Sequence, residues 1–224
     1  MNEHILPPPG SRGRLITFEG IDKCGKSTQA DLLRDALLAH GVPVGTTGAP
    51  GLVVREPGGT PIGEQVRDLL LHGGADLAPW TEALLYAAAR AELVAKVLRP
   101  SLAAGWVVLL DRYVDSTLAY QGCARGLGID TMLDLNELAT GGLMPDLTFI
   151  VAVSPAEAAG RTAGLPDRIE REGPTFQERV AEGYRQVARH FPERVVVVDG
   201  ARPAEQVAAQ VLTLTLKCVE NADV

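Results

Sequence analysis

The sequence predicts an α/β fold in which helices flank a parallel sheet of five strands. Short runs rich in Val, Leu and Ile alternate with longer segments of helical periodicity. Unbroken apolar runs suit strands that are covered on both faces, as in a parallel sheet with crossover helices. The chain has 224 residues, 46% of them hydrophobic, which suffices for the core of one such domain. The predicted strands cover residues 15–19, 52–55, 106–111, 147–153 and 195–199.

The segments between these strands carry helix and loop signals that agree with the fold. Ser154 precedes a proline at the first position of a predicted helix, and Glu157 stands at the third position, so a capped helix start is expected. Clusters of Pro and Gly at 48–51 and 56–59 predict loops. We expect a flexible leader over residues 1–12, a single domain over 13–218 and a short tail over 219–224.

Composition narrows the class of protein. The net charge of −7 argues against a polymeric nucleic-acid partner, because phosphate backbones are bound by basic surfaces. No apolar stretch approaches the ~20 residues of a membrane-spanning helix, and the amino terminus lacks the features of a secretory signal. Three scattered cysteines are too few for a disulfide framework or a zinc site, which suggests a reducing compartment, most simply the cytoplasm.

A glycine-rich loop follows the first predicted strand and leads into a predicted helix. Its glycines allow successive backbone N–H groups to point into one concavity, to which the helix adds the positive end of its dipole. Lys26 would reach the β and γ phosphates of a nucleoside triphosphate, and the Ser27 hydroxyl would ligate Mg²⁺. The strand–loop–helix context disfavours the alternative, a turn that merely joins two elements. The predicted triphosphate-binding residues are Gly20, Ile21, Asp22, Lys23, Cys24, Gly25, Lys26, Ser27 and Thr28.

Two further strand ends present an arginine to the same side of the sheet. Ligands of open α/β sheets bind beyond the carboxyl ends of the strands, where Arg55 and Arg112 stand. The planar guanidinium binds phosphate oxygens in pairs, so these residues predict a kinase whose acceptor already carries a phosphate. The alternative is that Arg55 pairs with Glu56 or a neighbouring helix, and Arg112 with Asp111 or Asp115.

Asp111 closes the third predicted strand. A carboxylate at this position of a nucleotide-binding sheet lies near the Mg²⁺, usually through water. Asp111 and Ser27 are therefore the candidate metal-binding residues. The alternative role of Asp111 is to cap the next helix.

Four segments together resemble the thymidylate kinase family. They cover residues 18–29, 55–60, 111–122 and 167–170, in the order that the family has. The first is shared by many nucleotide-binding proteins, whereas Arg-Glu-Pro-Gly-Gly-Thr and Asp-Arg-Tyr-x-x-Ser-x-x-Ala-Tyr-Gln-Gly are close to specific. The resemblance implies the nucleoside monophosphate kinase fold with a phosphate-binding loop and a mobile lid, and a homodimer packed through helices. It also implies phosphorylation of dTMP to dTDP, with ATP and Mg²⁺, for dTTP synthesis.

The resemblance also assigns the acceptor site. In such kinases an aromatic residue stacks on thymine and an arginine one turn later binds its carbonyl edge, which here are Tyr86 and Arg90. Residues four apart share a helix face, so both can meet one base. The family usually has Phe at Tyr86, and packing in the core is its alternative role. By the same resemblance Asp22 binds the sugar 3′-hydroxyl, Tyr120 disfavours a 2′-hydroxyl, Gln121 approaches the base and Ser116 joins the substrate-binding set with Arg55 and Arg112.

Catalysis needs no general base, because the acceptor phosphate is already an anion at neutral pH. Positioning and charge neutralisation remain, through Lys26, Arg112, Mg²⁺ and a lid predicted over residues 160–173. Family members tend to carry a catalytic basic residue in the loop or several arginines in the lid. We expect Lys23 to supply charge to the transition state, with Arg161 and Arg168 contributing from the lid. The alternative is that Lys23 is a solvated loop lysine.

Three other classes of protein fit the sequence less well. A regulatory GTPase would need a guanine-reading Asn-Lys-x-Asp segment, which the sequence lacks. Another nucleoside monophosphate kinase would differ in its acceptor. A catalytically silent nucleotide-binding module would have no need of Lys26, Ser27, Asp111 and both arginines.

Overall fold

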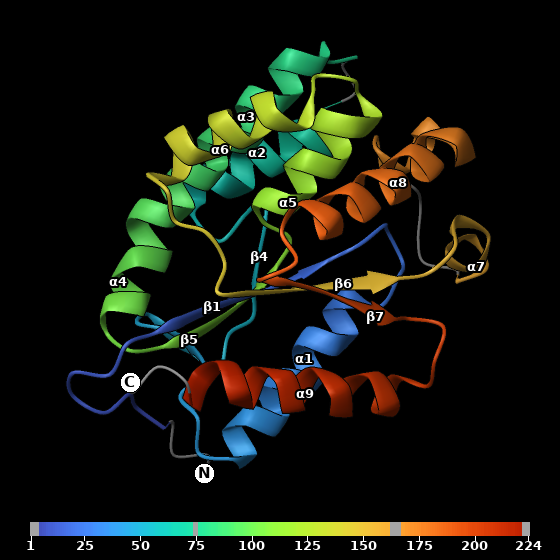
Figure 1. The fold of residues 1–224 in the computed structure, drawn as a ribbon. Helices are drawn as coiled ribbons and strands as arrows, with labels where there is room; N and C mark the ends of the chain where they lie inside the picture. The colour runs from blue at the N-terminus through green and yellow to red at the C-terminus, as the bar shows by residue number, and fades with distance from the viewer. Residues whose placement is uncertain (1–4, 74–75, 162–166, 221–224) are drawn as a thin grey trace.

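The computed structural model describes residues 5–73, 76–161 and 167–220. Within these residues a parallel sheet has the strand order β4-β5-β1-β6-β7 (Figure 1). Every neighbouring pair in it is parallel, so the predicted five-stranded parallel sheet is confirmed. Its strands are β1 (Arg14–Glu19), β4 (Val54–Arg55), β5 (Val107–Asp111), β6 (Leu147–Ala152) and β7 (Val195–Asp199).

A short antiparallel pair lies outside this sheet, where the sequence predicted a loop. Strands β2 (Gly45–Thr46) and β3 (Ala49–Pro50) pair there, and the first residues of the predicted 52–55 strand are not in a strand. The loop predicted over 48–51 is therefore wrong at 49–50. Gly45 has φ +133°, and a Cβ at this position would lie 2.5 Å from the amide nitrogen of Gly51. The absence of a side chain at Gly45 thus permits the tight pairing.

Helices cover both faces of the sheet. In Figure 1, α1 and α9 lie on one face, and α8 and α5 lie on the other with the α2, α3 and α6 group beyond them. Among the described residues, no helix combines the length and apolar character that crossing a membrane requires. The helices are α1 (Lys26–Ala39), α2 (Pro61–His72), α3 (Pro79–Leu93), α4 (Arg99–Ala103), α5 (Val114–Thr117), α6 (Ile129–Thr140), α7 (Pro155–Ala159), α8 (Pro174–His190) and α9 (Ala204–Glu220), and α9 runs past residue 218.

Local sequence signals explain several helix starts. Ser154 Oγ accepts a hydrogen bond from the amide of Glu157 at 3.2 Å, and the Glu157 carboxylate accepts one from the amide of Ser154 at 2.9 Å. This reciprocal pair confirms the capped start predicted for α7. At α2, Thr60 Oγ1 accepts from the amide of Gly63 at 2.9 Å, and Pro61 occupies the first helical position.

The core lies on both sides of β1. Ile16 and Phe18 join one cluster of buried side chains, whereas Leu15 joins a second cluster on the opposite face. Both faces of the strand are therefore covered, which is the physical reason for its unbroken apolar run. Helix α8 packs against the π-helical segment Leu118–Ala124, which follows α5 directly. A Cβ at Gly183 of α8 would lie 2.8 Å from Ala119 Cα, so a glycine is needed for this close approach.

Candidate active site

The glycine-rich loop lies between the end of β1 and the start of α1, as predicted. Gly20, Lys23 and Gly25 have φ of +138°, +63° and +103°, so the backbone has a positive φ at three positions within the loop. The Lys26 ammonium group donates to the carbonyl of Ile21 at 3.3 Å and lies 4.0 Å from the Asp22 carboxylate. The loop therefore curls around a lysine that is only 7% exposed.

Ser27 and Asp111 meet at the first turn of α1. The Ser27 hydroxyl donates to Oδ2 of Asp111, and the pairing of β1 with β5 aligns Phe18 with Asp111. The two side chains predicted to hold Mg²⁺ are thus in direct contact. Hydroxyl and carboxylate oxygens are the hard ligands that Mg²⁺ prefers, so these two residues fit the ion.

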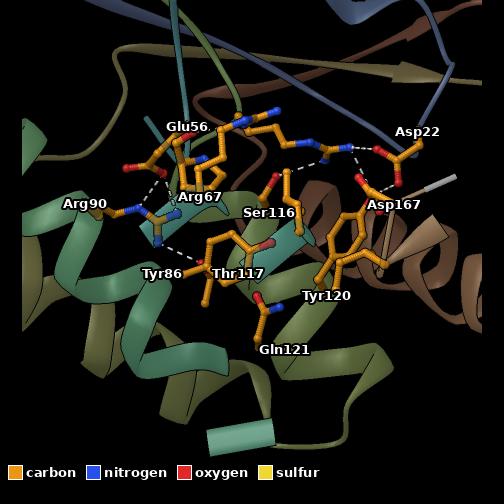
Figure 2. A pocket seen from close by; sticks show the side chains of 14 residues that line it. Asp22, Glu56, Arg67, Tyr86, Arg90, Ser116, Thr117, Tyr120, Gln121 and Asp167 are labelled. Carbon is orange, nitrogen blue, oxygen red and sulfur yellow. Dashed lines mark hydrogen bonds and ion pairs between the residues drawn. The ribbon is translucent and has the colours of Figure 1, made fainter. Parts of the chain in front are cut away.

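A pocket lies beside this loop, beyond the carboxyl ends of β1, β4 and β5 (Figure 2). It brings together every residue predicted to bind the acceptor except Arg55. The lining residues come from the glycine-rich loop, from the segments that follow β4 and β5, from α2, α3 and α5, from the π-helical segment that follows α5, and from residues 167–169. The lining residues are Asp22, Glu56, Pro57, Arg67, Leu71, Tyr86, Arg90, Arg112, Ser116, Thr117, Tyr120, Gln121, Asp167 and Ile169.

Arg112 joins the loop to the pocket. Its backbone has φ +71°, and its amide donates to the carbonyl of Phe18 at 3.0 Å, which fixes its start against β1. Its guanidinium donates to Asp22 at 2.5 Å and to the Tyr120 hydroxyl at 3.1 Å. Burial acts to raise the pKa of Asp22, but the charges of Arg112 and Lys26 lower it below its ordinary value. Asp22 and Arg112 therefore face the pocket as an ion pair.

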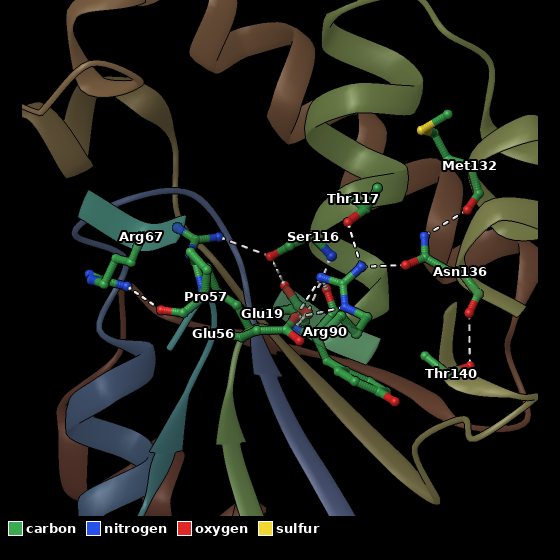
Figure 3. A network of polar contacts seen from close by, with 12 residues as sticks. Glu19, Glu56, Pro57, Arg67, Arg90, Ser116, Thr117, Met132, Asn136 and Thr140 are labelled. Carbon is green, nitrogen blue, oxygen red and sulfur yellow. Dashed lines mark hydrogen bonds and ion pairs between the residues drawn. The ribbon is translucent and has the colours of Figure 1, made fainter. Parts of the chain in front are cut away.

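Arg90 lies at the pocket, but its N–H groups point into the protein (Figure 3). Nε and Nη2 donate to one oxygen of Glu56 at 2.8 and 2.5 Å, and Nη2 also donates to the carbonyl of Tyr113. Nη1 donates to the side chains of Thr117 and Asn136. These contacts use all five donors of a guanidinium. The predicted bond from Arg90 to the base therefore requires an exchange of one of these partners.

Tyr86 lines the same pocket from α3 and is half-buried. Burial raises the pKa of its hydroxyl, so the ring is neutral at physiological pH. Tyr86 and Arg90 lie one helical turn apart and both reach the pocket, which agrees with the shared helix face that their spacing predicts.

Arg55 lies outside the pocket. Its side chain is 59% exposed and pairs at 3.2 Å with Glu64 of α2, which matches the alternative of a partner on a neighbouring helix. Arg67 of α2 lines the pocket instead and donates to the carbonyl of Pro57 at 2.9 Å. Sequence reasoning missed Arg67, although its position four residues after the buried Gly63 and three before Leu70 places it on the inward face of α2.

The basic residues predicted for catalysis from the lid separate into two places. Arg161 donates to the carbonyl of Cys24 at 2.9 Å and to that of Gly200 at 2.9 Å, so it lies against the glycine-rich loop. Arg168 instead donates to the carbonyl of Leu70 at 2.7 Å and to Glu82 at 2.6 Å, on the side of α2 and α3. Residues 162–166 of the predicted lid lie outside the described residues.

Lys23 is neither free nor fully solvated. Its ammonium group lies 3.7 Å from the carboxylate of Glu170, and both side chains are partly exposed. Behind the loop a second pocket is lined by Gly25, Thr28, Gln29 and Arg161, together with Arg202 from the loop before α9. The glycine-rich loop thus lines the acceptor pocket through Asp22 and this second pocket through Gly25 and Thr28.

Comparison with known proteins places the chain among relatives of similar length. The thymidylate kinase family model matches residues 18–211. A thymidylate kinase of Thermoanaerobacter sp. (strain X514) is 44% identical over 207 residues, which cover 92% of this chain and 98% of the relative. One from Deinococcus radiodurans is 43% identical over 90% of this chain and 95% of the relative, and one from Desulforudis audaxviator is 48% identical over 86% and 85%. The chain therefore belongs to the thymidylate kinase family.

Proposed function

We propose that this protein is a thymidylate kinase that transfers the γ-phosphoryl group of ATP to dTMP, giving dTDP and ADP. The observation that carries the proposal is the pocket beside the glycine-rich loop, where Asp22 and Arg112 form an ion pair opposite Tyr86 and Gln121. A phosphate at Arg112 would lie next to the loop that holds the triphosphate. Membership of the family supports the same reaction.

The reaction is an attack by an oxygen of the acceptor phosphate on the γ-phosphorus of ATP, with ADP as the leaving group. The attacking oxygen is already anionic, so the protein has to position the two nucleotides and neutralise charge. Lys26 would bind the donor phosphates from inside the loop, and Arg112 would bind the acceptor phosphate. Bound Mg²⁺, held by Ser27 and through water by Asp111, would offset negative charge on the donor phosphates.

The contacts of Arg161 support a binding site for the adenosine part of ATP. The second pocket shares no lining residue with the acceptor pocket, and Arg161 joins its part of the glycine-rich loop to the loop before α9. The adenosine part of ATP would extend from the loop into this pocket.

Tyr120 and Asp22 support a deoxyribose acceptor. The Tyr120 hydroxyl lies 3.3 Å from the Asp22 carboxylate and accepts a hydrogen bond from Arg112. An ionised Asp22 would accept a hydrogen bond from the sugar 3′-hydroxyl, while the ring of Tyr120 would leave little room for a 2′-hydroxyl.

A homodimer is part of the proposal. Large apolar side chains are exposed on α2, α3 and α6, three helices that lie together at one corner of the molecule in Figure 1. A second copy would cover this face, and sedimentation of the purified protein would give its mass. The exposed residues of this face are Ile62 and Leu69 on α2, Trp80 and Leu84 on α3, and Leu138 on α6.

A cytoplasmic location stays a prediction from the cysteine content.

The test is ADP release from ATP and Mg²⁺ with dTMP, dUMP, dCMP, dGMP, AMP or UMP offered in parallel. We expect rapid turnover with dTMP, slower turnover with dUMP and little with the others. Lys26→Met is the matched control, because it removes the ammonium group from the loop and should abolish turnover with every acceptor. Rapid turnover with a different monophosphate would overturn the assignment of the base site, and silence with all six would favour a binding module.

A further inference from the structure

Gln121 reaches the acceptor pocket with an amide whose orientation is set by a buried carboxylate. Its Nε2 donates to Oε1 of Glu82 at 2.7 Å, and Glu82 on α3 has no solvent exposure. Glu82 also accepts hydrogen bonds from Arg125 at 3.0 Å and from Arg168 at 2.6 Å. Two arginines and one amide thus converge on a single carboxylate.

Glu82 is ionised in this setting. Burial acts to raise its pKa, but the hydrogen bonds from Arg125, Gln121 and Arg168 lower it below the ordinary value for glutamate. An ionised carboxylate only accepts hydrogen bonds, so the group that Gln121 turns toward it must be the NH₂. The reversed amide would place two acceptor oxygens 2.7 Å apart, without a proton between them.

The other end of the amide is therefore the oxygen. Among the described residues, no side chain or backbone amide donates a hydrogen bond to it, and Gln121 lines the pocket together with Tyr86. In Figure 2 the amide oxygen lies on the side of Gln121 that faces Tyr86. A base stacked on Tyr86 would meet a hydrogen-bond acceptor at this wall.

We propose that Glu82 is a positioning residue that holds the Gln121 oxygen toward the pocket and thereby selects an acceptor base with an N–H on its pairing edge. Thymine and uracil carry this N–H between two carbonyl groups, whereas cytosine has a bare ring nitrogen in the same place. A bare nitrogen facing the fixed oxygen leaves two acceptors unpaired in a closed site, which weakens the binding of that base. The inference rests on the proposed function, because it concerns the base of the same acceptor.

The experiment compares kcat/KM for dTMP with kcat/KM for dCMP in Glu82→Gln. A neutral amide at position 82 can donate as well as accept, so Gln121 is no longer held in one orientation. We expect the dTMP-to-dCMP ratio to fall by about 10- to 100-fold, because the discrimination lost is that of one fixed hydrogen bond. Glu172→Gln is the control, because Glu172 pairs with Arg125 at 2.7 Å without touching Gln121, and its ratio should stay that of the wild type.

A purely structural role for Glu82 predicts a different pattern. Turnover would then fall by the same factor with both acceptors, and the unchanged ratio would overturn the proposal. An equal fall of the ratio in Glu172→Gln would overturn it too. In a Gln121→Leu background, Glu82→Gln should leave the ratio unchanged, and a further change would show that Glu82 acts without Gln121.

Folding and function are separated by two further measurements. If circular dichroism shows that Glu82→Gln does not fold, the same ratio of kcat/KM values is measured in Glu82→Asp. This variant keeps the charge for both arginines but shortens the side chain by one methylene, and the ratio should again fall. Failure of the proposed function has its own signature, which is absence of wild-type turnover with dTMP.

Discussion

Arg90 and Glu56 form an ion pair in which each side chain is 1% exposed, and both of the Arg90 nitrogens that contact Glu56 bond to its Oε2. The second oxygen, Oε1, is buried and has no hydrogen-bond partner among the described residues. Because the pair closes one end of the acceptor pocket, its geometry bears on both stability and binding.

Glu56→Ala should destabilise the protein strongly. The substitution leaves the guanidinium of Arg90 buried without its counterion, a situation that costs about 3–5 kcal/mol. Urea unfolding at pH 7 measures the free energy of unfolding. Arg34→Ala is the control, because Arg34 on α1 pairs with Asp31 and Asp35 at the surface. This variant should lower the free energy of unfolding by only about 0–1 kcal/mol. Equal losses in the two variants would contradict this prediction.

Glu19, at the end of β1, makes the free energy of unfolding depend on pH. It is fully buried and accepts hydrogen bonds from the Tyr113 amide at 2.7 Å, the Ser116 hydroxyl at 2.6 Å and the Tyr184 hydroxyl at 2.8 Å. Burial, aided by the charge of Asp115, raises the pKa of Glu19 from 4.5 to about 7.

The sign of the effect follows from which state holds the proton. Between pH 4.5 and 7 the folded protein keeps a proton on Glu19 that the unfolded chain has released, so the free energy of unfolding falls as the pH rises. The full shift corresponds to roughly 3 kcal/mol, and above pH 7 no further loss arises from this group. Urea unfolding of the wild type and Glu19→Gln from pH 4 to pH 8 isolates the contribution. Parallel curves for the two proteins would contradict it.

The parts of the fold that the sequence predicted are those with local signals. Residues buried on both faces of the sheet must be apolar, so β1 and β6 are found where their apolar runs stand. Glycines at forced turns and the capped start of α7 are equally local. Half of the 14 residues that line the acceptor pocket were predicted, because the resemblance to the family assigns them to the acceptor site.

The parts that were missed depend on contacts between distant segments. Glu82 is buried by Arg125 and Arg168, which lie 43 and 86 residues further along the chain, and no local pattern reports such pairing. Arg55 was expected at the pocket because it ends a strand. Side chains alternate along that strand, however, so the burial of Val54 leaves Arg55 exposed at the edge of the sheet.

Asp111→Asn should weaken the use of Mg²⁺. The variant keeps the shape of the side chain next to Ser27. It removes the negative charge that attracts the hydrated Mg²⁺ ion. The expected results are a lower kcat and a concentration of Mg²⁺ for half-maximal rate that rises about tenfold, both read from the rate of ADP release with dTMP. Asp31→Asn on the exposed face of α1 loses the same charge at a distance from the loop and should behave as the wild type. An unchanged Mg²⁺ requirement would leave Asp111 only a structural role.

Lys23→Ala tests the role of the loop lysine in charge neutralisation. Both residues bear a Cβ, so the left-handed backbone at this position is equally strained before and after the substitution. Charge supplied only in the transition state predicts that kcat falls about 10- to 100-fold while KM for ATP and dTMP changes little. Steady-state kinetics with each substrate varied in turn gives both constants.

Glu170→Gln separates this role from that of the ion pair. It removes the partner of Lys23 and leaves the ammonium group in place. A catalytic Lys23 then keeps a kcat at or above that of the wild type, because its charge is no longer shared with a carboxylate. If the pair itself matters, by holding Glu170 against the loop, the two substitutions lower kcat by similar factors. Equal losses would therefore assign Lys23 to structure and leave Lys26 and Arg161 as the cations that contact the donor.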